Sequence, residues 1–406
     1  MIPSPLLPVE EALQAILAGV KGQTPVEHVN LVQALGRVLA GDLDARRTQP
    51  PVNVSAMDGY ALIHADLTQL PARLAIIGAS AAGHGFAGRI NHGQAVRIFT
   101  GAPVPSGADT VIIQENTSAD GDHVIINEAE ALGRNIRKAG LDFVKGDALL
   151  KKGHRLSAPD LALAAAMNHA QLPVHKKPLI AILATGDELV APGQEPGADQ
   201  IVASNSFAVG AYAQAAGADV LDLGIAGDRY EDLQQAFARA RAAKVDVLVT
   251  LGGASVGDHD LVQSALKREG MELGFWKIAM RPGKPLMHGR MDAMQILGLP
   301  GNPVSAIVCA VLFLVPLVRA LSGDQQAGED RSIAGILGCD LGPNDSRQDY
   351  LRASVTSQHH GLPIAIPFGR QDSSMLRTLA ASQALVIRAP HAPAAKTGDP
   401  CRLVLL

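Results

Sequence analysis

Apolar and polar residues recur with different periods in successive parts of the chain. Near the N-terminus, VEEALQAILAGV (9–20) and VEHVNLVQALGRVLA (26–40) place apolar residues three or four positions apart, which predicts two helices. From about residue 72 to 150, short β-rich runs are separated by glycine and proline: RLAIIGAS, QAVRIFTGA, DTVIIQEN and HVIINEA. A further helix is predicted to begin after Ser157, because Ser157 and Asp160 match a capping box ahead of an apolar run.

Between residues 177 and 323, apolar runs alternate with helical stretches such as YEDLQQAFARARAAK. The runs LIAILAT, DVLDLGIAG, DVLVTLGG, LGFWKIAM and QILGL are nearly continuous in apolar residues. This alternation predicts a parallel, doubly wound sheet that is covered by helices on both faces. After about residue 330 the chain returns to short strands, YLRASVTS, LPIAIPF, ALVIRAP and CRLVLL, which predict a small β-barrel or sandwich.

Composition narrows the possible functions. At 406 residues the chain is too long for one ordinary core, so two to four domains are expected. An aromatic content of 3% and a formal net charge of -4 argue against a nucleic-acid-binding surface. The cysteines Cys309, Cys339 and Cys401 are far apart, so neither a disulfide framework nor a thiolate metal site is expected.

The sequence suggests no membrane insertion. The N-terminal MIPSPLLPVEEAL has no basic or cleavable apolar region, so no secretory signal is expected and the predicted location is cytoplasmic. Residues 293–318 carry no charge, but Asn302, Pro303 and Pro316 interrupt them. Only 305–315 is expected to be a continuous helical run, well short of the roughly 20 residues that a span needs. We therefore expect a buried core helix that has Asn302 as N-cap and Pro303 in its first position.

Polar residues follow the predicted strands of the α/β region. In an open parallel sheet, ligands bind outside the carboxyl ends of the strands. Five strand ends are therefore expected to meet at one rim and to form a ligand site. The residues at these ends are Gly186, Asp187 and Glu188; Asp228; Ser255, Asp258 and Asp260; Lys277, Arg281 and Lys284; and Asn302 and Ser305.

The loop in LVTLGGASVGDHDLV (248–262) combines two conflicting features. Its glycines leave room for an anion, yet Asp258 and Asp260 would repel one. Two unit charges about 4 Å apart repel by about 4 kcal/mol at an effective dielectric near 20. Mg²⁺ would resolve the conflict, because it prefers oxygen ligands and bridges carboxylates to phosphates. The expected metal ligands are Glu188, Asp228, Asp258 and Asp260, with Lys277, Arg281 and Lys284 meeting the remaining negative charge.

Each of these side chains also has a simpler interpretation. Asp228 and Asp258 would serve only as helix N-caps, and Lys277 and Arg281 would belong to a solvated face. The gathering of acids and bases at one rim favours a site. Glycine and proline around the basic residues also indicate a shaped loop.

Other catalytic motifs fit less well. GASVG (253–257) matches the nucleophile elbow of hydrolases, and Asp292 with a histidine at 359 or 360 has the required order. Those histidines belong to the C-terminal β region, however, and a hydrolase has no need of acids at the neighbouring strand ends. A Walker loop is excluded because proline, rather than Ser or Thr, follows the lysine of GKP (283–285).

Several segments taken together resemble one family. They are NVSAMDGYAL (53–62), IFTGAPVPSGADTVIIQE, ATGDELVAPG, GGASVGDHD, MRPGKPL and LPGNPVSA, followed by YLRA and RQDSSML. In this order they resemble the signature segments of the molybdopterin molybdenumtransferases, the MoeA family, to which the C-terminal domain of gephyrin is related. The resemblance covers essentially the whole chain. It implies a helical linker (1–45 and 140–176), a β-rich insert (46–139), an α/β molybdopterin-binding domain like MoaB and Mog (177–325), and a C-terminal β domain (326–406).

The resemblance also implies a reaction. Members of the family take adenylylated molybdopterin and molybdate, insert molybdenum between the dithiolene sulfurs and release AMP, with Mg²⁺ as cofactor. They usually form an elongated homodimer, and contacts with the adenylyltransferase or with acceptor molybdoenzymes are implied as well. Two alternatives remain open: a related nucleotide pyrophosphatase, and a non-catalytic molybdopterin-binding scaffold.

Residue roles follow from the same resemblance, position by position. Asp58 and Thr100 lie in the insert, which in the family reaches the α/β domain of the partner subunit. The implied catalytic residues are Asp58, Thr100, Glu188, Asp228, Asp260, Lys277 and Lys284. The implied substrate-binding residues are Thr185, Gly186, Asp187, Gly252, Gly253, Ser255, Gly257, Arg281, Pro300, Gly301, Asn302, Ser305, Arg352 and Ser373. The sequence departs from the family pattern at Val52, Asn53 and Asp372, the last of which replaces a usual glycine.

Overall fold

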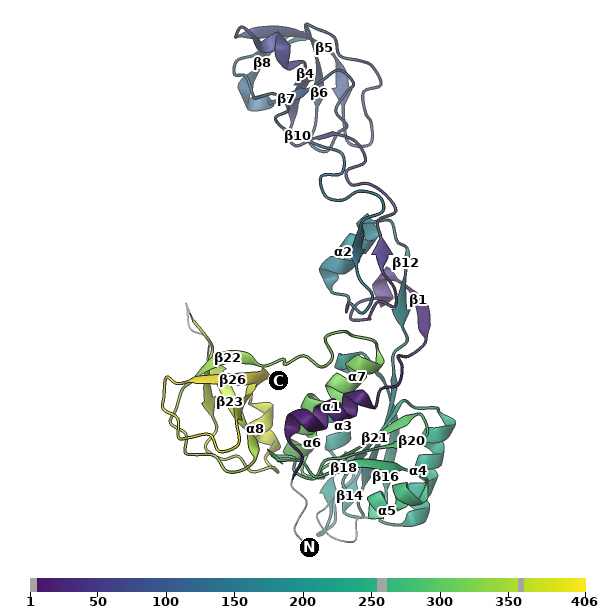
Figure 1. The fold of residues 1–406 in the computed structure, drawn as a ribbon. Coiled ribbons are helices and arrows are strands. Elements are labelled where there is room, and N and C mark those ends of the chain that lie inside the picture. The colour runs from purple at the N-terminus through teal and green to yellow at the C-terminus, as the bar shows by residue number, and fades with distance from the viewer. Residues whose placement is uncertain (1–5, 254–260, 357–360) are drawn as a thin grey trace.

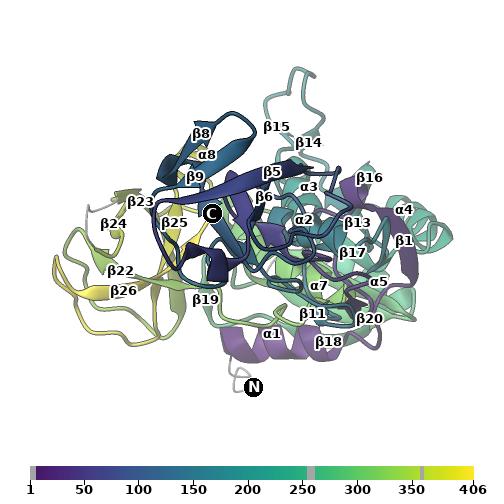
Figure 2. The ribbon, with the colours of Figure 1, turned by 90° about the horizontal axis from the view of Figure 1, so that it is seen from above.

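The computed structural model describes residues 6–253, 261–356 and 361–406. The molecule is elongated, with a β-rich insert at one end, a linker in the middle, and the α/β and C-terminal domains side by side at the other end (Figure 1). Figure 2 looks along the long axis from the insert toward the other two domains.

The α/β domain is built on a six-stranded sheet. Its strands are β13 (Leu179–Thr185), β16 (Asp219–Ala226), β17 (Val247–Leu251), β18 (Glu272–Trp276), β20 (Met287–Met291) and β21 (Met294–Leu299). They lie in the order β16-β13-β17-β21-β20-β18. The first four in this order are mutually parallel, whereas β20 is antiparallel to both of its neighbours. The five expected strands therefore run in one direction, which confirms the predicted fold class, and β20 is an addition that the sequence pattern did not reveal.

Helices cover both faces of this sheet, because its strands are apolar on both sides. The helices are α1 (Val9–Ala18), α3 (Asn205–Ala216), α4 (Tyr230–Ala242), α5 (Leu261–Arg268), α6 (Pro303–Cys309) and α7 (Val315–Leu321). One face buries Ile180, Val249 and Leu297 in the core shared with α1, α3, α6 and α7. The other face buries Leu248 and Ile296 with α4 and α5.

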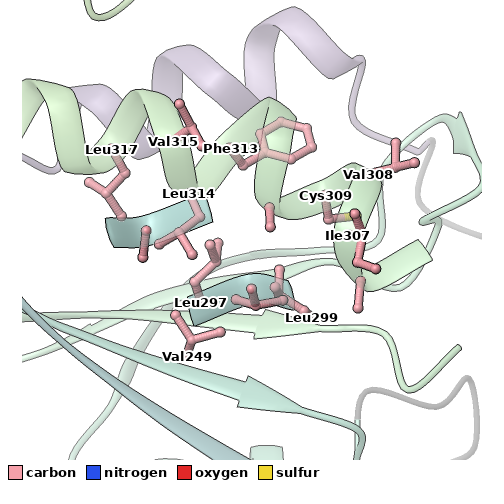
Figure 3. Close-up of a cluster of buried hydrophobic side chains, with 14 of the residues drawn as sticks. Val249, Leu297, Leu299, Ile307, Val308, Cys309, Phe313, Leu314, Val315 and Leu317 are labelled. Atoms are coloured by element: carbon pink, nitrogen blue, oxygen red, sulfur yellow. The ribbon is translucent and has the colours of Figure 1, made fainter. Parts of the chain in front are cut away.

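The longest helical run is the core helix Pro303–Leu321, which joins α6 and α7 through a π-helical segment (Ala310–Leu314). Its side chains pack directly on the strands of the sheet (Figure 3). Asn302 and Pro303 begin it as expected, but the expected end before Pro316 was wrong. The wide π turn immediately before Pro316 is the kind of local adjustment that accommodates a proline lacking an N–H donor. The helix is long and apolar enough to cross a membrane, yet 83% of its most apolar 18-residue segment is buried inside the protein.

The linker is less helical than the sequence suggested. The expected helix over 26–40 was wrong: β1 (Val26–Asn30) and a single 3-10 turn occupy its first half. Strand β1 pairs antiparallel with β12 (Gln171–His175), so pairing with a distant segment overrides the local periodicity. The linker also contains β2 (Leu43–Asp44), β11 (Ala148–Leu150) and α2 (Ala158–Ala166). Helix α2 begins with the expected capping box, in which the Ser157 N–H donates to Asp160 Oδ2 at 2.7 Å.

The insert is a sheet in the order β7-β4-β6-β5-β9-β8. Its strands are β4 (Gly59–Leu62), β5 (Ala72–Ser80), β6 (Gln94–Ile98), β7 (Thr110–Ile113), β8 (Thr117–Asp120) and β9 (His123–Ile126). Each of the four β-rich runs seen in the sequence forms one of these strands. A short pair, β3 (Val54–Ser55) and β10 (Ile136–Arg137), joins the sheet to the linker.

The C-terminal domain is a small closed barrel. Its strands are β22 (Ile333–Leu337), β23 (Gln348–Thr356), β24 (Ile364–Pro367), β25 (Ala384–Arg388) and β26 (Pro400–Leu405), with α8 (Leu376–Ala380) beside them. Pairing of β23 with both β24 and β25 closes the ring. The short strand β19 (Met280–Arg281), which follows β18 of the α/β domain, pairs with β23 and thereby joins the two domains.

Candidate active site at the carboxyl edge of the central sheet

A pocket of about 930 Å³ lies at the carboxyl ends of β13, β17 and β21, where the sequence placed the ligand rim. The first turns of α3 and α6 and the short pair β14 (Leu189–Val190) and β15 (Ile201–Val202) form its other walls. Ser374 enters from the C-terminal domain. The expected site residues that line the pocket are Thr185, Gly186, Glu188, Asp228, Gly252, Gly253, Pro300, Gly301 and Asn302.

Glycine is favoured or required at two positions in the pocket wall. Gly186 has φ +142°, and a Cβ on it would lie 2.2 Å from Glu188 Oε2, because the Glu188 carboxylate folds back over this residue. Gly252 has φ +100°, and a Cβ on it would lie 2.7 Å from the carbonyl oxygen of Thr185. Gly186 is therefore favoured by its backbone angle, whereas Gly252 is required because the turn after β17 lies against the main chain at the end of β13.

Glu188 and Asp228 bring two carboxylates to the same pocket. Asp187 acts differently, because its Oδ1 accepts the N–H of Asp228 at 3.0 Å and so fixes the turn after β16. Within the described part of the chain, no Lys or Arg forms an ion pair with Glu188 or Asp228. Their negative charge is therefore uncompensated by these residues.

The expected metal site is only partly within the described residues. Glu188 and Asp228 supply oxygen donors of the kind that Mg²⁺ prefers. Among residues 6–253, 261–356 and 361–406, no group of three or more His, Cys, Asp or Glu is placed to hold a metal ion. The remaining expected residues of this loop, Ser255, Gly257, Asp258 and Asp260, lie outside the described residues.

The basic segment forms a tight turn beside the pocket. The Lys277 N–H donates to the Leu286 carbonyl at 3.0 Å, and the Ile278 N–H donates to the Lys284 carbonyl at 2.9 Å. Pro285, within this turn, lines the pocket. Lys277 and Lys284 themselves flank the wall rather than forming it, and the Lys277 ammonium lies 3.7 Å from the centroid of the Trp276 ring.

Arg281 lies at the domain junction and does not line the pocket. Its Nε donates to Asp349 Oδ1 at 2.8 Å and its Nη2 donates to Oδ2 of the same carboxylate at 2.5 Å. Asp345 is a second acidic neighbour, with Oδ2 at 3.3 Å from Nη1. The hydrogen bonds to Asp349 raise the pKa of Arg281. Arg281 thus forms an ion pair that joins the α/β domain to the barrel, and its expected substrate contact stays a prediction.

The loop before α8 closes the pocket from the C-terminal side. The Ser373 carbonyl accepts the N–H of Val304 at 3.0 Å, at the first turn of α6. Asp372 Oδ1 accepts from the N–H and the hydroxyl of Ser374 at 2.9 and 2.6 Å, so this departure from the family's glycine builds a local turn. Ser305, in the same turn of α6, is buried and lies behind the wall.

Arg352 is buried between β23 and the loop before α8, with 1% of its surface exposed. Its Nε donates to Gln371 Oε1 at 3.2 Å and its Nη1 donates to the Met375 carbonyl at 3.2 Å. Its Nη2 is buried without a hydrogen-bond partner in the part of the chain that the structure describes. Burial lowers the pKa of Arg352, and Asp372 opposes this effect. The guanidinium supports the loop that carries Ser373 from behind.

Asp58 and Thr100 meet in the insert, far from the pocket of the same chain (Figure 1). Asp58 Oδ1 accepts from the N–H and the hydroxyl of Thr100 at 2.7 and 2.8 Å, and these bonds lower the pKa of Asp58. A second cavity of about 450 Å³ lies beside this loop, and Gly101, Arg47 and Arg137 help to line it. Sequence reasoning missed both arginines. Their only signal was that Arg47 stands two residues before Gln49 in RRTQPP and that Arg137 belongs to the basic segment RNIRK.

The structure argues against the hydrolase interpretation, because Asp292 is not near the pocket. Asp292 follows β20, which is antiparallel to β21, so it lies at the amino edge of the parallel strands and opposite the pocket. Ser255 and the histidines at 359 and 360 lie outside the described residues.

Comparison with known proteins places the whole chain among related sequences. Residues 7–168 match the MoeA N-terminal region (domains I and II), residues 181–320 match a probable molybdopterin binding domain, and residues 334–406 match the MoeA C-terminal region (domain IV). The molybdopterin molybdenumtransferase of Haemophilus influenzae is 33% identical over 94% of both chains. That of Bacillus subtilis is 35% identical over 94% of this chain and 90% of its own.

The fold has a similar solved counterpart. The molybdopterin biosynthesis MoeA protein of Pyrococcus horikoshii superposes with a TM-score of 0.85 at 26% identity, over 99% of this chain and 100% of its own. The agreement over nearly full length extends to all four regions of the molecule.

Proposed function

This chain belongs to the molybdopterin molybdenumtransferase (MoeA) family, and from that premise we propose that it inserts molybdate into adenylylated molybdopterin with release of AMP. The observation that carries the proposal is the pocket at the carboxyl edge of the sheet, in which glycine turns adjoin Glu188 and Asp228. A transferase in molybdenum cofactor biosynthesis needs such a place for a phosphate-linked substrate.

The pocket suits a polyanion joined to a larger organic group. Gly252 and Gly253 follow β17 directly, so phosphate oxygens can approach the backbone there. Asn302 stands at the N-terminus of the core helix, where the helix dipole favours negative charge. Ile201 and Val202 give the opposite wall an apolar surface. We assign the glycine turns to the pyrophosphate link and the apolar wall to the remainder of the substrate.

A divalent cation fits the acidic side of the pocket. Glu188 and Asp228 are oxygen donors without a cationic partner among the described residues, and this is the donor chemistry that Mg²⁺ requires. We propose that these two residues hold Mg²⁺ together with Asp258 and Asp260, whose positions lie outside the described residues. When bound, the ion would neutralise phosphate charge. Lys277 and Lys284 would stabilise charge that develops on the phosphate oxygens as the link breaks.

The Asp58–Thr100 loop suggests that the active site is shared between two copies. Within one chain the linker separates this loop from the pocket by much of the molecule's length (Figure 1). We propose a homodimer in which the insert of each copy completes the pocket of the other, with the adenylyltransferase or an acceptor molybdoenzyme as further partners. The relatives' biosynthetic role favours the cytoplasm as the location.

The deciding experiment follows AMP release from adenylylated molybdopterin and Mg²⁺, with and without molybdate. We expect AMP to appear only when molybdate is present, together with molybdenum bound to the dithiolene. Equal AMP release in both reactions would instead identify a pyrophosphatase. Tight binding without AMP release in either reaction would identify a scaffold, and either result would overturn the proposal.

A further inference from the structure

Trp276, the only tryptophan of the chain, contacts the ammonium group of Lys277, a residue to which we have assigned a role in the reaction. We propose that Trp276 is a positioning residue: its indole face holds the Lys277 ammonium beside the pocket, ready to meet a phosphate group of the substrate. This inference rests on the proposed function for the identity of the substrate. The contact between the two side chains stands on the structure alone.

The contact depends on an unusual backbone. Successive side chains of a strand point to opposite faces, so Trp276 at the end of β18 and Lys277 after it would normally point apart. Lys277 has φ +75°, in the left-handed region that residues with a side chain rarely adopt. The turn that results brings the ammonium to 3.7 Å from the ring centroid, well within the range of a cation–π interaction.

Both partners are fixed next to the pocket. Trp276 is half-buried and packs against the apolar cluster that contains Val262, and Val262 lines the pocket. On the other side, the Lys277 N–H donates to the carbonyl of Leu286, the residue after pocket-lining Pro285. The indole and the lysine backbone are therefore anchored to two different segments that also contribute residues to the pocket wall.

An aromatic ring holds a cation in a way that a carboxylate does not. Arg281, four residues further on, is held by Asp349, which neutralises its charge and accepts hydrogen bonds from its Nε and Nη2. The indole attracts Lys277 through its quadrupole and leaves the positive charge, and the N–H donors that do not face the ring, for an anion. Restricting the flexible lysine before the substrate arrives also reduces the conformational entropy lost on binding.

A double-mutant cycle separates positioning from packing. We expect Trp276→Leu to lower kcat/KM for AMP release by about 3- to 30-fold, and Trp276→Phe, which keeps a weaker ring, by less. In a Lys277→Met background, Trp276→Leu should cause no further loss, because the group that it positions has been removed. An equal loss in both backgrounds would show that Trp276 acts only through packing and would overturn the inference.

Fluorescence of the single tryptophan tests the contact without any turnover. We expect Lys277→Met to shift the emission spectrum of the free protein, whereas Lys244→Met, at an exposed turn after α4, should not. Pyrophosphate, used as the probe, should alter the emission of the wild type and have a smaller effect in Lys277→Met.

These measurements also keep the two proposals apart. An AMP assay that fails in the wild type counts against the proposed function, while the emission of Lys277→Met still decides the contact. An unchanged emission spectrum in Lys277→Met would overturn the inference even if AMP release is normal. Circular dichroism and thermal unfolding identify any variant that fails to fold. If Trp276→Leu does so, the cycle is run with Trp276→Phe instead.

Discussion

The pocket of the α/β domain and the Asp58–Thr100 loop of the insert both present acids, but they are built in opposite ways. In the pocket, Glu188 and Asp228 have no cationic partner among the described residues. In the insert, one oxygen of Asp58 already accepts two hydrogen bonds from Thr100. The difference suggests that the pocket acids are there to bind a cation, whereas the Asp58 carboxylate holds a loop in a shape that another surface recognises.

The largest effect is expected at the pocket. Asp228→Ala should reduce AMP release by about 10²- to 10³-fold, the usual cost of removing a preorganised electrostatic group from an active site. The fold should change little, because Asp228 makes no ion pair among the described residues. Asp219→Asn, at the opposite end of the same strand β16, is the matched control and should retain activity. Wild-type AMP release in Asp228→Ala would remove this residue from the proposed metal site.

A mixing experiment tests whether the two regions belong to one site. Asp58→Ala and Asp228→Ala should each be nearly inactive alone, but random mixed dimers of the two should recover about a quarter of wild-type activity, because two-fold symmetry leaves one intact site in each heterodimer. The measurement is AMP release after the subunits are exchanged, with size-exclusion chromatography to confirm dimers. No recovery in verified heterodimers would contradict a site shared between copies.

A smaller effect is expected for the ion pair between Arg281 and Asp349. Asp349→Ala removes the partner of Arg281 and should lower the free energy of unfolding by about 1 kcal/mol, since Arg281 is 47% exposed and water screens the pair. AMP release should fall far less than in Asp228→Ala. The measurement is unfolding by urea. Asp345→Ala, which removes the longer and more exposed contact with Arg281, should lower the urea midpoint less than Asp349→Ala does. A loss of AMP release as large as that in Asp228→Ala would contradict a purely structural role for this ion pair.

The smallest effect is a pH dependence of the insert loop. Hydrogen bonds from Thr100 lower the pKa of Asp58, so the ionised carboxylate stabilises the loop above its ordinary pKa of about 4. This stabilisation should disappear as the pH falls through the lowered pKa. The protection factor of the Thr100 amide, obtained by NMR after correction for the intrinsic pH dependence of exchange, should therefore fall in acid. Asp58→Asn should exchange with no such transition, and a transition that persists in this variant would assign it to another group.

The central sheet could be predicted because its strands are buried on both faces. Such strands are continuous apolar runs, which can be identified in the sequence without knowing what they pair with. The linker could not, because the apolar residues of 26–40 suit a helix as well as a strand, and only pairing with β12 selects the strand. The pocket rim followed from topology, which brings Glu188 and Asp228 together. The ion pair between Arg281 and Asp349 could not be predicted, because Asp349 comes from a separate domain whose docking no local pattern reveals.

The packing of α1 against α7 has a consequence for folding during synthesis. It packs against α7 and the π-helical segment, yet about 300 residues separate α1 from α7 in the chain. At about 5 to 20 residues per second, a ribosome needs roughly 15 to 60 s to supply that partner. The apolar face of α1 therefore lacks this packing partner while the linker and the insert are being synthesised. Helix α1 therefore reaches its final packing only after the much later α7 has been synthesised.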